Sequence, residues 1–325
     1  MLSLWKTTFL STGMLFAAGI LAAAPAPVAR PGTVNYVEGQ VTLNGQSLGA
    51  KSIGSTEVEP GQVLQTGQGK AEMLLTPGVY LRLADHSAAK MVSPSLTDTR
   101  VELLRGEAML EADELLAGNH LVVSDHGVDT NIRKNGIYKF TSDPPQVSVY
   151  DGKAQVFEND RSVQFGKGKQ LTLVADAGLK PVKFDRQQTD SLYQWSDVRS
   201  EYLAEANQSS VQTILADPWG WWGMGWYWNP WFDAWDFVPG DGLFYSPFGF
   251  GFYSPIYWSY YAPSRYYVRP GVIAATPHVA RGFATGSALR GPVMRTPMMR
   301  APAMGRTTMR APMGGLRMGG FGGRR

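Results

Sequence analysis

The chain reads Gln146-Val147-Ser148-Val149-Tyr150-Asp151-Gly152-Lys153-Ala154-Gln155-Val156-Phe157-Glu158 near its centre. Two runs of alternating apolar residues meet there at an Asp-Gly pair, which supplies the two positive-φ positions of a type I′ turn. The valines and the phenylalanine of the two runs favour strands and can cover one buried face. The pattern therefore predicts a β-hairpin with Asp151 and Gly152 as its turn.

Similar short runs fill residues 34–174, and Asn44-Gly45 is a second two-residue turn signal. Helical periodicity is absent from this region, which predicts an all-β domain of short antiparallel strands arranged as stacked hairpins, a sandwich or a solenoid. We expect its strands near residues 34–37, 40–43, 63–65, 71–75, 79–83, 88–92, 101–104, 108–111, 121–124, 128–132, 137–140, 162–165 and 170–174.

Five ordered landmarks in residues 34–174 resemble the FecR-type domain: Pro60-Gly61-Gln62-Val63-Leu64-Gln65-Thr66, Gly78-Val79-Tyr80-Leu81-Arg82-Leu83, Leu104-Arg105-Gly106-Glu107-Ala108, the Asp151-Gly152 region, and Gly168-Lys169-Gln170-Leu171. These landmarks are strand and turn signatures without chemistry. The resemblance implies a β-domain. In FecR itself, this external domain relays a transporter signal to a cytoplasmic anti-sigma segment.

The first 26 residues have the pattern of a signal peptide. Lys6 precedes an uncharged stretch from Thr7 to Ala24, and small residues follow. We expect export to the periplasm, cell envelope or exterior, and an uncleaved membrane anchor is the alternative. About six residues precede the apolar stretch, so we expect no cytoplasmic anti-sigma part.

Residues 186–208 change to three-to-four spacing of larger side chains, which predicts an amphipathic helix. The positions on its stripe are Leu192, Trp195, Val198 or Arg199, Tyr202 and Ala206. Docking on the β-domain or on the next segment is the favoured interpretation, because exposed aromatic rings on an exported helix would promote association. A partner-binding helix is the alternative.

Residues 219–261 contain eight of the ten tryptophans, interleaved with Gly and Pro. Rings at this density bury large apolar areas when they find a surface. Three interpretations stay open: packing within the protein, stacking on sugar rings, and insertion at a membrane interface. The candidate interaction residues are Trp219, Trp221, Trp222, Trp226, Trp228, Trp231 and Trp235.

Residues 263–325 are rich in Gly, Pro, Met and Arg, in loose repeats such as Met299-Arg300-Ala301-Pro302, and predict a disordered, low-complexity tail. Of the net charge of +3, residues 242–325 contribute +11, so residues 1–241 carry −8. We expect the tail to contact anionic envelope polymers or lipid surfaces rather than nucleic acid; a tail that only aids solubility is the alternative.

The sequence predicts no catalytic, cofactor-binding or metal-ligating residue. Asp85-His86-Ser87 has the residue types of a catalytic triad, but neighbours in a strand point to opposite faces, and a turn is expected there. His120, Asp125, His126 and Asp129 match no known metal-site spacing. The chain has no cysteine, which excludes disulfides and thiolate sites.

Two functional hypotheses follow. The first is a non-enzymatic exported envelope protein that binds polysaccharide, or acts as a scaffold, through its β-domain and aromatic segment. The second is an extracytoplasmic sensing or regulatory protein, related to FecR-type sigma-factor regulation, that acts through a separate protein partner.

Overall fold

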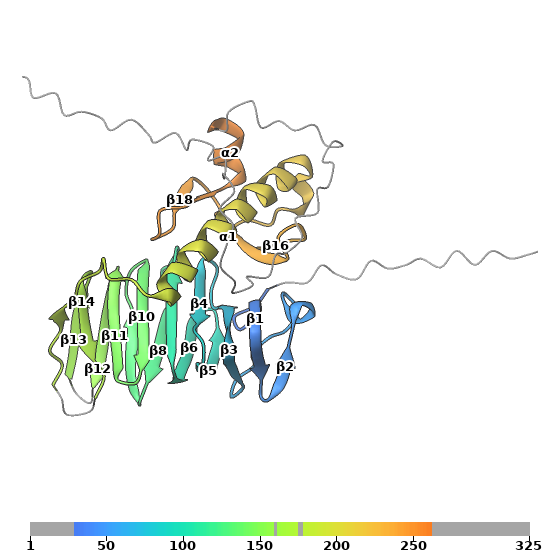
Figure 1. Ribbon diagram of the computed structural model, residues 1–325. Helices are drawn as coiled ribbons and strands as arrows, with labels where there is room; N and C mark the ends of the chain where they lie inside the picture. The colour runs from blue at the N-terminus through green and yellow to red at the C-terminus, as the bar shows by residue number, and fades with distance from the viewer. Residues whose placement is uncertain (1–28, 159–160, 175–177, 262–325) are drawn as a thin grey trace, which may run out of the picture. The chain divides into compact units, whose positions relative to one another are not determined.

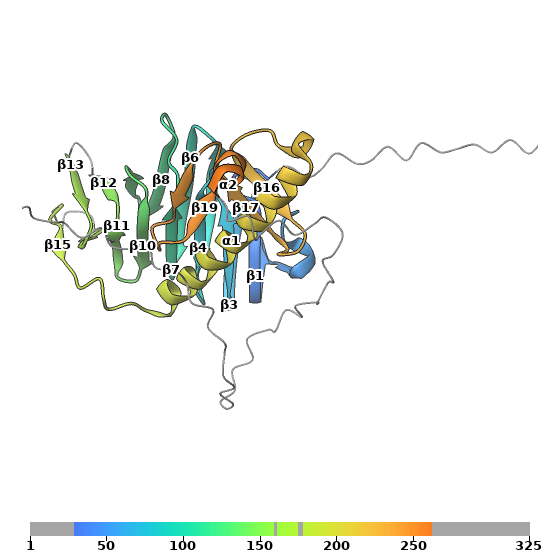
Figure 2. The same ribbon diagram turned by 90° about the horizontal axis from the view of Figure 1, so that it is seen from above.

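The computed structural model describes residues 29–158, 161–174 and 178–261 (Figures 1 and 2). It confirms the predicted fold class, since a large, almost wholly antiparallel sheet is followed by one long helix. The predicted signal peptide and the predicted low-complexity tail lie outside the described residues. Within those residues, no helix has the length and apolar character needed to cross a membrane.

The main sheet has two arms that meet at the long strand β3 (Val63–Leu74), which pairs with β5 through residues 63–65 and with β4 through residues 71–74. The first arm contains, in spatial order, β5 (Ala88–Ser95), β6 (Asp98–Arg105), β8 (His120–Asp125), β9 (Val128–Ile132), β12 (Lys153–Glu158) and β13 (Arg161–Gly166). The second contains β4 (Val79–Leu83), β7 (Glu107–Ala112), β10 (Gly136–Ser142), β11 (Pro145–Asp151), β14 (Lys169–Thr172) and β15 (Val182–Lys183).

Two further strands and a short helix flank β3. Strand β1 (Val34–Leu43) pairs with β3, and β2 (Gln46–Leu48) pairs with β1. A 3₁₀ helix, η1 (Ala50–Ser52), follows. All the neighbouring strands are antiparallel except β6 and β8, which run parallel because the chain crosses between the arms before β8.

The main core contains side chains from both arms. Leu81 of β4 and Leu110 of β7 belong to the same buried cluster as Val101 of β6 and Val123 of β8. Alternate residues along each strand enter this core, as a period of two requires. Outer-face residues of β4, β7, β10 and β11 in the second arm are buried as well, because the helix and the aromatic segment cover them.

One predicted hairpin is confirmed. Asn44 and Gly45 have φ of 48° and 84°, and Leu43 pairs with Gln46 across them. The central prediction at Asp151-Gly152 is wrong, because β11 pairs with β10 and β14 whereas β12 pairs with β9 and β13.

Gly152 instead forms a corner where the chain crosses from one arm to the other. Its φ is 96°, and a Cβ atom there would lie 2.1 Å from the Tyr138 hydroxyl oxygen. The alternation predicts burial correctly for Val147, Val149 and Val156, which are all in the core, but Phe157 is 39% exposed. The Tyr138 hydroxyl of β10 accepts a hydrogen bond from the Lys153 amide at 2.9 Å, which ties the corner to β10.

Helix α1 (Ser191–Ala216) begins five residues later and ends eight residues later than predicted. The Asp190 side chain caps it by accepting a hydrogen bond from the Tyr193 amide at 2.8 Å. The helix ends before Asp217-Pro218, because a residue that precedes proline disfavours the helical conformation. Of the two alternatives on the predicted stripe, Arg199 is buried and Val198 is exposed.

The aromatic segment folds into short elements that pack with α1 on the second arm: η2 (Pro218–Gly220), β16 (Gly225–Asn229), β17 (Ala234–Val238), β18 (Leu243–Tyr245), β19 (Gly251–Tyr253) and α2 (Pro255–Tyr261). One buried cluster joins Leu74 and Tyr80 of the main sheet to Leu203 of α1 and Trp235 of β17. The interpretation that the helix and much of the aromatic segment pack within the protein is confirmed.

Candidate functional site

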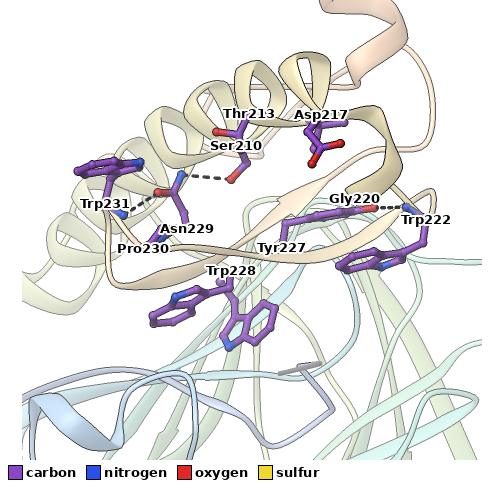
Figure 3. A pocket seen from close by; sticks show the side chains of 12 residues that line it. Ser210, Thr213, Asp217, Gly220, Trp222, Tyr227, Trp228, Asn229, Pro230 and Trp231 are labelled. Atoms are coloured by element: carbon purple, nitrogen blue, oxygen red, sulfur yellow. Dashed lines mark hydrogen bonds between the residues drawn. The ribbon is translucent and has the colours of Figure 1, made fainter. Parts of the chain in front are cut away.

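An open groove of about 400 Å³ runs between the last turns of α1 and the β16–β17 hairpin (Figure 3). Trp222 and Trp231 lie at opposite ends of it in this view, with Tyr227 and Asn229 between them. The residues that line the groove are Ser210, Thr213, Ile214, Asp217, Gly220, Trp222, Tyr227, Trp228, Asn229, Pro230, Trp231 and Trp235.

The two end rings are held in place yet remain accessible. Trp222 is 59% exposed and stacks on Tyr227, with ring centroids 4.5 Å apart and planes 16° apart. The Tyr227 hydroxyl fixes the loop that carries Trp222, because it donates a hydrogen bond to the Gly223 carbonyl at 2.7 Å and accepts one from the Trp222 amide at 3.0 Å. Trp231 is 68% exposed, and its amide donates to Asn229 Oδ1 at 3.0 Å. The groove therefore presents two accessible aromatic rings on anchored loops.

Buried polar side chains lie between the two rings, behind the surface of the groove. Asn229 Nδ2 donates hydrogen bonds to Ser210 Oγ at 3.1 Å and to the Ala206 carbonyl at 3.0 Å. Ser210 Oγ in turn donates to the buried carboxylate of Asp236 at 2.8 Å. Thr213 and Asp217 are exposed on the helix side. This chain of hydrogen bonds links α1 to both β16 and β17.

Asp236 has the most strongly shifted pKa of the acidic residues near the groove. Burial raises the pKa of its carboxyl group to about 8, although the hydrogen bond from Ser210 acts in the opposite direction. One carboxylate oxygen, Oδ2, has no hydrogen-bond partner among the described residues. Asp236 therefore carries a proton over much of the neutral range.

Four buried charges join α1 to the main sheet. Glu72 accepts hydrogen bonds from Arg82 at 2.7 Å and from Arg199 of α1 at 2.8 Å, and Glu111 accepts from Arg82 and from Ser200 of α1. Burial alone would raise the pKa of Glu72, but the charges of Arg199 and Arg82 outweigh it and lower that pKa to about 2. The charges of two carboxylates and two guanidiniums thus balance. Their hydrogen bonds hold in place the helix that forms one wall of the groove.

The seven tryptophans proposed as interaction residues divide into two sets. Trp222, Trp228, Trp231 and Trp235 line the groove. The others do not: Trp219 is 97% exposed on η2, Trp226 is buried edge-on to Tyr80, and Trp221 packs beside Ile214 and Val211.

Sequence reasoning missed the helical wall of the groove. Ser210, Thr213 and Asp217 lie beyond the predicted end of the helix at residue 208. Ser210 is buried, and its hydroxyl bridges Asn229 and Asp236. Asp217-Pro218 was the available signal for the helix end.

The histidine-containing motifs form no recognisable catalytic arrangement. Asp85 and His86 lie in a turn, as predicted. His126 Nδ1 lies 2.7 Å from the buried Asp125 carboxylate, which Ser142 also contacts, so the serine bonds to the acid and not to the imidazole. Within residues 29–261, apart from the short undescribed gaps, no group of three or more His, Asp or Glu is placed to hold a metal ion.

No family model and no curated protein matches the chain. Two crystal structures of a candidate anti-sigma factor from Parabacteroides distasonis ATCC 8503, at 2.50 and 1.65 Å resolution, are similar to it at 16% and 14% identity. Each match covers 42% of this chain, with a TM-score of 0.33. The chain spans less than two thirds of those proteins, 62% and 64% of their lengths.

Proposed function

We propose that the protein is a non-enzymatic component of the cell envelope that binds polysaccharide in the groove between α1 and β16. The observation that carries this proposal is the pair of exposed rings, Trp222 and Trp231, at the two ends of a groove that has the exposed Thr213 and Asp217 on its helix side (Figure 3). Sugar-binding sites need both elements: aromatic faces for the C–H faces of pyranose rings, and polar groups for their hydroxyls.

The groove favours a glycan over a lipid surface. A membrane-interface site would present its rings on a surface that can enter the headgroup region, whereas these rings flank a concavity. Thr213 and Asp217 lie exposed along its edge, where their side-chain oxygens can accept hydrogen bonds from ring hydroxyls.

The charge of the groove also limits the kinds of polysaccharide that can bind there. Of its described lining residues, only Asp217 is charged. An anionic polymer would meet a carboxylate without a cation to balance it. We therefore infer that the groove takes an uncharged stretch of a polysaccharide, and that the arginine-rich tail contacts envelope polyanions.

The test is retention on insoluble polysaccharides. The full chain is mixed with peptidoglycan, chitin and cellulose at about 0.5 M NaCl, where the arginine tail contributes little. We expect saturable retention on at least one of them, and loss of retention in a Trp222→Ala/Trp231→Ala variant. Absence of retention on all three, or retention that the double variant leaves unchanged, would contradict the proposal.

A further inference from the structure

Positive charge gathers at the far end of the main sheet, where β13 and β15 are the last strands of the two arms (Figure 1). Residues 1–261 carry a net charge of −8, because the whole chain has +3 and residues 262–325 hold eleven arginines and no acid. Against this background, four short segments at this end, residues 133–136, 150–153, 166–169 and 182–186, hold seven cations and two acids. We call the seven cations the basic corner: Arg133, Lys134, Lys153, Lys167, Lys169, Lys183 and Arg186.

Backbone contacts bring these four segments together. The Arg133 amide donates a hydrogen bond to the Lys153 carbonyl at 2.8 Å, and Lys153 is the cross-strand partner of Gly166. The Phe184 amide donates to the Gly168 carbonyl at 3.1 Å, which joins the last segment to the turn between β13 and β14. The basic corner is therefore one surface, although its residues span more than fifty positions of the sequence.

Two of the lysines face each other directly. Lys169 of β14 and Lys183 of β15 are cross-strand partners. Like charges in this position destabilise a sheet, and an anion held between them would remove that cost. Arg186 lies close by, since a Cβ atom at Gly168, the residue before Lys169, would lie 3.7 Å from its Cδ atom. This arrangement favours a negatively charged ligand.

The acids of the four segments do not balance this charge. Within the part of the chain that the structure describes, the one ion pair of the basic corner joins Lys167 to Asp151 at 2.7 Å. The second acid, Asp185, is exposed and accepts a hydrogen bond from the Gln187 amide at 3.0 Å. Most of the cations are exposed and available to a ligand, namely Arg133, Lys134, Lys167, Lys169, Lys183 and Arg186.

The surroundings of the basic corner indicate the class of anion. Its aromatic rings pack on one another, with the Tyr150 centroid 5.0 Å from that of Phe184 and 4.9 Å from that of Tyr193. These rings are buried or half-buried, so they offer no open face for a nucleic-acid base and no anchor for a lipid interface. The cations also lie on four separate segments, which fits the repeated charges of a polymer better than a single small anion.

We propose that the basic corner binds an anionic polysaccharide, a sugar polymer with repeated negative charges. This surface is distinct from the groove: Arg186 lies just before α1 begins at Ser191, whereas the groove lies at the last turns of the helix. A helix of 26 residues is about 39 Å long. The proposal goes beyond the glycan site in the groove and does not rest on it.

The test compares two variants of the full chain that each lose two positive charges. Lys169→Gln/Lys183→Gln changes the basic corner, and Lys51→Gln/Arg105→Gln changes two exposed cations elsewhere. Both variants keep the arginine-rich tail and have the same net charge, so a difference between them reports on position alone. The corner variant should stay folded, because it removes a repulsion between exposed side chains. Circular dichroism checks this.

Kd for alginate and for dextran sulfate is measured between about 50 and 200 mM NaCl. We expect the corner variant to raise Kd about fivefold at the lowest salt and to reduce the slope of log Kd against log salt by about 1–2, whereas the control changes Kd less than about twofold. Equal effects of the two variants, or no binding of either polymer, would overturn the proposal. A corner variant that weakens binding to phosphatidylglycerol vesicles or to duplex DNA more than to these polymers would overturn the choice of a polysaccharide. Retention in the groove is measured at about 0.5 M NaCl, where this binding is lost, so the two proposals fail separately.

Discussion

Replacing Gly152 by alanine tests the corner that joins the two arms of the sheet. Its φ of 96° costs an L-residue about 1–2 kcal/mol, and the new Cβ would lie 2.1 Å from the Tyr138 hydroxyl oxygen and 2.8 Å from the Asn135 carbonyl oxygen. The hydroxyl must therefore move. It donates to the Lys134 carbonyl and accepts from the Lys153 amide, and each lost hydrogen bond costs about 1 kcal/mol or more.

The sum is a loss of about 3–4 kcal/mol in the free energy of unfolding, or a fall of roughly 10 °C in Tm for a domain of this size. Thermal and urea unfolding followed by circular dichroism measure it. Gly45→Ala is the matched control, since φ is 84° there but no atom lies within 4 Å of the added Cβ. The corner explanation fails if Gly152→Ala costs no more than Gly45→Ala.

Three further predictions concern buried charge. The pKa of Asp236 is about 8 in the folded protein, whereas an unperturbed aspartate has a pKa of 3.8, so its contribution to stability falls as pH rises from about 4 to about 8. Asp236→Asn should therefore flatten the pH dependence of the free energy of urea unfolding between these values. An unchanged slope would contradict the burial of a protonated Asp236. The pKa of Glu72 is shifted in the opposite direction, to about 2, so its contribution to stability is complete above about pH 4.5 and is lost as pH falls through about 2. Glu72→Gln should flatten the stability profile only in this acidic range. Arg199→Met should lower the free energy of unfolding by about 3 kcal/mol, because it leaves Glu72 with one guanidinium. Arg100→Met is the control: Arg100 and its partner Asp98 are 40% and 45% exposed, so its loss should cost less than about 1 kcal/mol. Equal costs in urea unfolding would contradict a stabilising role for the buried charges.

The sequence predicted most of the strands in residues 34–174 but not all of their pairing. Alternation placed Val147, Val149 and Val156 in the core correctly, because a period of two holds whatever the partner strand is. The Asp-Gly signal could not distinguish a hairpin from a corner. That choice depends on the distant Tyr138 hydroxyl, which anchors the Lys153 amide.

The candidate site was predictable in composition only. The density of rings pointed to residues 219–261, but the packing of these residues with α1 and the main sheet determines which rings reach the groove. Trp226 packs edge-on to Tyr80, whereas its neighbours Tyr227 and Trp228 both line the groove. The helical wall was missed because the predicted helix ended at residue 208, and the buried Ser210 gains its hydrogen-bond partners only from the distant Asn229 and Asp236.

The most direct test of the glycan site compares two exposed tryptophans. Trp231 lies at an end of the groove, whereas Trp219 is more exposed but does not line it. Calorimetric titration with soluble fragments of peptidoglycan, chitin and cellulose, at about 0.5 M NaCl, gives Kd for the full chain and for each alanine variant. We predict that Trp231→Ala raises Kd at least about tenfold, the effect of losing a main aromatic contact, and that Trp219→Ala leaves it within about twofold. Equal effects of the two substitutions, or no binding by the full chain, would contradict a glycan site in this groove.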